Sequence, residues 1–148
     1  MITENTKKRR IELFEILNNI EMAKTEEKRV EGIRHFAAQY PSFKDYLRCL
    51  LDDRITFNLP EGRPPFTPSH EVHHPTTWHK QHLKLGYFVK GGKGQTMAQV
   101  KRESMWINLL ESIHPEDAVL VADSADKRGG PDWLTKEIVE EALPNLIS

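Results

Sequence analysis

The sequence predicts an all-α fold, a compact bundle of about five to six helices with a long central connection rich in proline and histidine. Apolar residues recur at three- and four-residue spacing before residue 52 and again after residue 95, as they do on the buried face of a helix. Between these stretches, residues 53–94 hold five of the nine prolines and five of the seven histidines. Because 148 residues suit one domain, we expect a single helical domain, 1–148, with three parts: 1–52, 53–94 and 95–148.

The N-terminal part is predicted to contain three helices joined by short turns. Their apolar stripes cover residues 5–23, 25–40 and 42–51. Thr25 is expected to cap the second helix, and Ser42, with Asp45 three residues later, is expected to cap the third. Pro41 should separate these two helices because the residue before a proline avoids helical geometry.

The first half of the central connection is dominated by proline. Prolines fix the backbone dihedral and lack an amide donor, so residues 60–68 are expected to form a rigid loop. Such a loop can present a binding surface, and it can also be a structural crossover between two halves of a bundle. The candidate interaction residues in this connection are Arg63, Pro64, Pro65, Phe66 and Trp78.

The second half of the connection is rich in histidine. The candidate metal ligands are His70, His73, His74, His79 and His82. His70, Glu71 and His74 match the H-E-x-x-H pattern, in which two histidines one helical turn apart bind zinc and the glutamate is the general base. That mechanism needs a helix, whereas Pro75 pushes His74 away from helical geometry. Three interpretations stay open: a polar surface segment, a zinc-binding site, and a metal-dependent hydrolase.

The C-terminal part is predicted to contain a long helix and two shorter ones. Residues 95–113 form the long helix, with Met97, Val100 and Trp106 among its inward residues and Lys101 and Arg102 facing solvent. Its start is expected at a capping box of Thr96 and Gln99. Pro115 suits the first position of the next helix, and residues 135–143 are expected to form the last one.

Overall charge, the single cysteine and the length of the apolar runs indicate which partners and which compartment to expect. The formal net charge is -1, from 21 basic and 22 acidic residues, so nucleic acid is not the expected partner. The cations that would support nucleic-acid binding are Lys7, Lys8, Arg9, Arg10, Lys80, Lys84, Lys90, Lys93, Lys101 and Arg102. The single cysteine, Cys49, lies among apolar residues and is expected to be buried in a reducing compartment. No apolar run approaches the roughly 20 residues of a membrane span, so no membrane partner is expected.

Four blocks of sequence, taken in order, resemble a known family. They are LPEGRPPF, FVKGGKG, KRESMWINLLESIHPEDAVLVADSADK and LTKEIVEEALPNLI. Together they resemble small uncharacterised proteins of T-even-like tailed bacteriophages, over most of the chain after about residue 25. The chain departs from that pattern at Ala125, where lysine is common, and in its histidine-rich segment. The resemblance implies a phage origin and a helical fold, and it implies no catalytic residues.

These observations favour a non-enzymatic interaction module that docks on a phage or host protein in the host cytoplasm. No catalytic constellation appears beyond the H-E-x-x-H pattern, so we predict no enzymatic activity and no required cofactor. One alternative is a virion-associated structural component. The other is a zinc protein or metal-dependent hydrolase that uses the histidines between His70 and His82. The identity of the partner and the oligomeric state are left open by the sequence.

Overall fold

The structure is a computed structural model that describes residues 10–148, and it confirms the all-α prediction. Within these residues there are seven α-helices, one 3₁₀ helix and no strand. The elements are α2 (Leu13–Glu21), α3 (Glu26–Gln39), α4 (Pro41–Leu51), α5 (Trp78–Gln81), η1 (His82–Tyr87), α6 (Gln99–Ser112), α7 (Pro115–Ser124) and α8 (Lys136–Ala142). No helix in this part of the chain is both long and apolar enough to cross a membrane.

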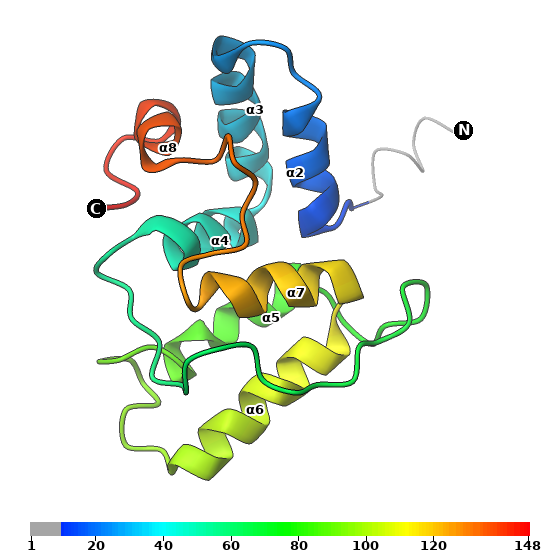
Figure 1. The fold of residues 1–148 in the computed structure, drawn as a ribbon, viewed down its shortest axis with the longest axis vertical. Helices are drawn as coiled ribbons and strands as arrows, with labels where there is room; N and C mark the ends of the chain where they lie inside the picture. Colours follow the sequence, from blue (N-terminus) through cyan, green and yellow to red (C-terminus); the bar gives the residue numbers. More distant parts are fainter. Residues whose placement is uncertain (1–9) are drawn as a thin grey trace.

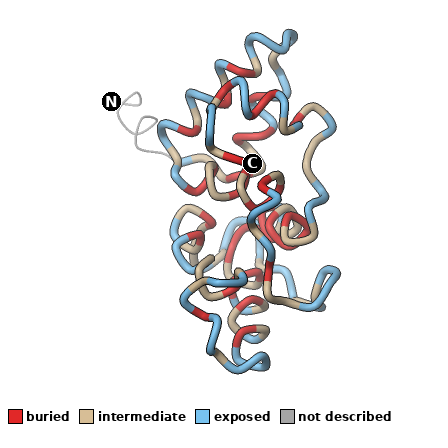
Figure 2. Tube along the Cα trace, turned by 90° about the vertical axis from the view of Figure 1, so that its left-hand side faces the viewer, coloured by how far each residue is buried: buried red, intermediate tan, exposed pale blue. Residues whose placement is uncertain are grey.

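Helix α7 lies across the middle of an elongated bundle (Figure 1). On one side of it stand α2, α3, α4 and α8, and on the other lie α5, η1 and α6. Helix α7 contacts helices on both sides, since it packs against α2, α4 and α6. Buried residues run through both halves, so one hydrophobic core spans the bundle (Figure 2).

The second and third helices of the N-terminal part begin and end within one residue of their predicted positions. The first is shorter than predicted: α2 begins at Leu13, after a capping box in which the Glu12 amide donates to Glu15 Oε1. The cations Lys7, Lys8 and Arg9 lie outside the described residues, and Arg10 is exposed. At α3 the predicted cap is present, because Thr25 Oγ1 accepts the Lys28 amide at 3.2 Å.

The start of α4 differs from the prediction. Tyr40 is the N-cap and Pro41 is the first helical residue, so Ser42 lies inside the helix and caps nothing. Proline is well suited to this first position, because the amide that it lacks would have no partner there. Ser42 is buried, and its hydroxyl lies 2.6 Å from His79 Nδ1.

The central connection contains more structure than its composition predicts. Residues 78–87, expected to belong to an irregular connection, form α5 and η1. Trp78 begins α5 and is almost completely buried, with its indole N–H donating to the Ser42 carbonyl at 2.9 Å. A single antiparallel bridge joins Phe57 to Val89, so the two ends of the connection lie side by side.

The long helix α6 begins four residues later than predicted. Its N-cap is Ala98, and the predicted capping box of Thr96 and Gln99 does not form. Val100 is 78% exposed instead of buried, and Arg102 is 3% exposed instead of facing solvent. Arg102 is buried because its guanidinium donates to the carbonyls of Gly94, at 3.0 Å, and Met97, at 2.8 Å, in the glycine-rich turn before the helix. These bonds, with that of Nη1 to Gln99 at 2.7 Å, satisfy the two Nη groups of the buried cation, and Nε is buried without a partner.

Candidate functional site

An open apolar groove runs between α2 and α7, with a volume of about 530 Å³. We call it the α2–α7 groove. Helix α2 contributes four lining residues, Phe14, Leu17, Asn18 and Glu21. Helix α7 contributes four more, Pro115, Glu116, Val119 and Leu120. The groove is completed by Pro68 from the end of the proline loop and by the turn Gly129, Gly130 and Pro131.

Most of the residues that line this groove are apolar. Leu17 is buried, and Phe14, Val119 and Leu120 are half-buried, so they present hydrocarbon to the groove while their inner atoms join the core. A larger hollow, of about 700 Å³ beside α8, is lined mainly by charged and polar side chains such as Lys136, Glu137 and Glu140. Exposed apolar surface with a polar rim is typical of sites that bind another protein.

Asp117 fixes the distance between the two helices of the groove. Its carboxylate reaches from α7 to the start of α2, where it accepts the amide of Leu13 at 3.0 Å and that of Phe14 at 2.8 Å. The side chain is fully buried, and this burial raises its pKa to about 7 against the opposing effect of the two amide bonds. A single carboxylate therefore caps α2 and ties it to α7.

His114 supports the same junction from the N-cap of α7. Its Nδ1 accepts the Glu116 amide at 3.0 Å, and its ring lies 4.4 Å from the ring of Phe14. The ring of His74 meets it edge-on at 5.5 Å. This end of the groove is therefore held by aromatic contacts as well as by Asp117.

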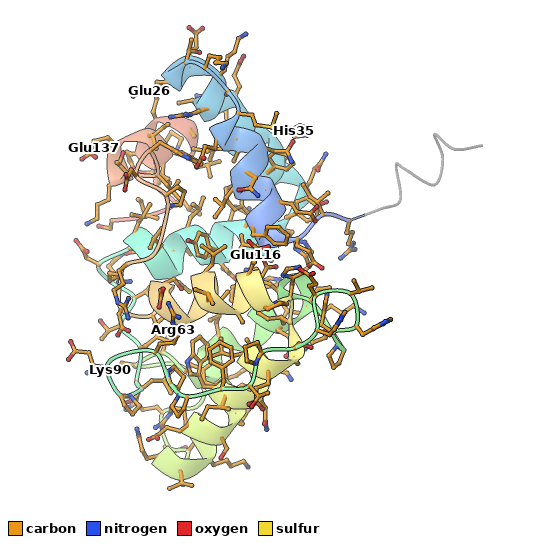
Figure 3. All side chains as sticks on the ribbon, turned by 45° about the vertical axis from the view of Figure 1, so that its right-hand side comes forward. Glu26, His35, Arg63, Lys90, Glu116 and Glu137 are labelled. Carbon is orange, nitrogen blue, oxygen red and sulfur yellow. The ribbon has the colours of Figure 1, made fainter. Side chains whose placement is uncertain are left out.

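The proline loop packs against α7, and its arginine, Arg63, bonds to a carboxylate of that helix. Arg63 donates to both carboxylate oxygens of Asp123, with Nε to Oδ1 at 3.1 Å and Nη2 to Oδ2 at 2.8 Å. Figure 3 shows Arg63 beside α7. Such a paired fork is the strongest geometry for a guanidinium with a carboxylate, and it raises the pKa of Arg63. The loop is thus a structural strap, in agreement with the crossover interpretation.

The other candidate interaction residues divide between core and surface. Phe66 packs partly buried against the core, Pro64 is half-buried, and Pro65 is exposed. Trp78 is 1% exposed, so we remove it from the candidate interaction residues. A buried indole fills the core between α4 and α5 and has no surface to offer to a partner.

Three of the five candidate metal ligands are built into the interior. His79 lies between the Ser42 hydroxyl and the Ile11 carbonyl, each at 2.6 Å, and stacks on Tyr40 at 4.5 Å; burial lowers its pKa. His82 Nδ1 lies 2.6 Å from Asp45. His74 contacts the Thr76 carbonyl and Glu12. Both ring nitrogens of His74 and of His79, and Nδ1 of His82, thus contact different partners.

The remaining two, His70 and His73, are exposed and have rings 5.3 Å apart. His70 and His74 do not lie on a helix, so the geometry that the H-E-x-x-H mechanism requires is not formed. Among residues 10–148, no three side chains of histidine, cysteine, aspartate or glutamate gather as metal ligands would. The thiol of Cys49 is buried, which raises its pKa to about 12 and keeps it protonated.

A family model spans most of this architecture. The model of a family of unknown function (DUF6433) matches residues 16–129, which is the greater part of the chain. The chain belongs to the DUF6433 family. No curated protein and no solved structure shows significant similarity to the chain. The DUF6433 match includes Arg63 and Asp123, so the strap lies within the family region, and it includes Asp117 but not the Leu13 and Phe14 amides that Asp117 accepts.

The groove is the feature that sequence reasoning missed. Its two walls are about a hundred positions apart in the DUF6433 chain, and each wall has the composition of an ordinary amphipathic helix. One signal was available: α7 carries Val119 and Leu120 beside Ala118, Val121 and Ala122, an apolar run wider than one buried face needs.

Proposed function

We propose that this protein is a non-enzymatic, phage-encoded interaction module that docks on a phage or host protein in the host cytoplasm. The phage assignment is supported by the ordered blocks of sequence that resemble T-even-like phage proteins. The α2–α7 groove carries the docking part of the proposal. It offers half-buried hydrocarbon on two helices that Asp117 already holds in place, so binding would cost little reorganisation.

The proline loop has a supporting role in this proposal. Arg63 bonds Asp123 through Nε and Nη2, so a partner could use only the remaining N–H groups of the exposed guanidinium. The loop instead ends at Pro68, which lines the groove. We therefore expect the loop to position one wall of the docking site, with Phe66 as its internal anchor.

Site-specific crosslinking in infected cells tests the proposal. A photo-crosslinking amino acid replaces Asn18, an exposed groove residue on α2, and in a matched control it replaces Ser104, an exposed residue on α6. We expect one protein to be captured, as a one-to-one adduct, from position 18 and not from position 104. Mass spectrometry of the crosslinked product identifies it.

Equal capture from both positions, or capture from neither, would contradict docking through the groove. Comparable yields of purified, folded protein for both variants are the necessary control, checked by far-ultraviolet circular dichroism. Substrate turnover by the purified chain would contradict the non-enzymatic part of the proposal separately.

A further inference from the structure

We infer that the α2–α7 groove binds an amphipathic helix of a partner protein whose apolar stripe is flanked by lysine or arginine. This inference rests on the proposed function and names the class of partner. It follows from three features of the groove: the charge of its rim, the absence of a free backbone edge in its walls, and its dimensions.

The rim of the groove is acidic. Glu21 on α2 and Glu116 on α7 line it, and both are exposed. Figure 3 shows Glu116 near the middle of the molecule, below α2, with Glu26 and Glu137 toward the upper end. The sequence around α7 adds no cation to this rim, because residues 103–126 contain no lysine or arginine.

The nearby cations are already engaged. Arg128, beside the glycine turn, pairs with Asp123 at 3.6 Å and with Asp126 at 3.9 Å. Arg29 lies 5.4 Å above the ring of Trp133 and donates to the Glu21 carbonyl at 3.1 Å. Within residues 10–148, no cation forms an ion pair with Glu116. A basic flank on the partner would complement this rim.

A helix fits this site better than an extended peptide. The two helices that line the groove, α2 and α7, cross one another (Figure 1), and their backbone groups are bonded internally, so they offer no strand edge that an extended backbone could join. A docked helix satisfies its own backbone and presents an apolar stripe. The nine residues of α2 span about 13 Å, which matches two to three turns of a bound helix.

Two synthetic peptides test the inference directly. Both are amphipathic helices with the same leucine stripe, and their flanks carry lysine in one and glutamate in the other. We expect the lysine peptide to bind more tightly and to crosslink from position 18 and not from position 104. Fluorescence anisotropy at about 0.15 M salt, where the Debye length is about 8 Å, gives the affinities.

Charge reversal at the rim supplies the decisive comparison. Glu21→Lys with Glu116→Lys should weaken binding of the lysine peptide about tenfold, because each change replaces an attraction by a repulsion at the rim. The matched control, Glu140→Lys with Glu141→Lys on α8, makes the same charge change away from the groove. The control should leave the affinity within about twofold, since exposed charges beyond a Debye length are screened. Thermal unfolding of both variants checks that each is folded.

Three results would overturn the inference. Equal losses in the rim and control variants would show non-specific attraction, and equal binding of the two peptides would show that the rim does not select charge. A chain that sediments as a dimer and becomes monomeric on Glu116→Lys would show that a second copy occupies the groove. If position 18 still captures a protein in infected cells in the first two cases, the docking proposal stands and only the partner class is lost.

Discussion

The central connection and the α2–α7 groove use their side chains in opposite ways. Residues 53–94 carry the unusual composition of the chain, yet Arg63, Trp78 and three of their histidines contact polar groups in other parts of the protein. The groove is built from ordinary helix residues, and these leave apolar surface exposed. An unusual composition can thus have a structural cause. A connection without regular backbone hydrogen bonds needs bonds from side chains in their place.

Removal of the largest buried side chain of the connection should have the largest effect. Trp78→Ala empties core volume between α4 and α5 and leaves the Ser42 carbonyl without its indole donor. We expect the free energy of unfolding to fall by about 3–5 kcal/mol, the usual cost of truncating a buried aromatic side chain. Urea unfolding followed by circular dichroism measures it.

Val72→Ala is the matched control in the same connection. Val72 is 72% exposed, so the free energy of unfolding should change by less than about 0.5 kcal/mol. A small loss for Trp78→Ala, similar to this control, would mean that the connection does not form part of the core. The comparison with the groove would then lose its basis.

Asp117 gives the groove a pH dependence of intermediate size. Its pKa is raised to about 7 by burial, whereas the carboxyl of the unfolded chain titrates near 3.8. The native state therefore binds a proton more readily than the unfolded chain between about pH 4 and 7. Across that range this residue should lower the free energy of unfolding by up to about 1.4 kcal/mol for each unit of rising pH.

Asp117→Asn isolates this contribution, because the amide has the same shape and no titration. The variant loses one of the two bonds to the amides of Leu13 and Phe14, so it should be less stable than the original protein at pH 5. The difference should shrink as the pH rises to 7. Urea unfolding at four pH values tests this, and a constant difference would place the carboxylate in a more polar site than its burial indicates.

The sequence predicts the helices well where the spacing of apolar residues agrees with the capping and proline signals at the helix ends. Thr25 and Pro41 mark boundaries that the structure places within one or two residues. The prediction fails at Arg102, since a guanidinium counts as polar and its burial depends on the Gly94 and Met97 carbonyls in a folded turn. Spacing along the chain does not specify such contacts. Likewise, the groove depends on the meeting of α2 with α7, which no local pattern encodes.

The last comparison lies within the histidine segment, between its exposed and its enclosed histidines, and the exposed pair has the smallest expected effect on stability. His70 and His73 are exposed at the tip of the connection, whereas His79 is enclosed by Ser42, Ile11 and Tyr40. The double change His70→Ala with His73→Ala should alter the free energy of unfolding by less than about 0.5 kcal/mol, as surface substitutions usually do. His79→Ala should lower the free energy of unfolding by about 1–3 kcal/mol, because it leaves buried polar groups without a partner.

Urea unfolding with and without added zinc tests whether the exposed pair, His70 and His73, binds metal. Stabilisation by zinc that disappears in the double variant would show that the exposed pair has a metal-binding role after all.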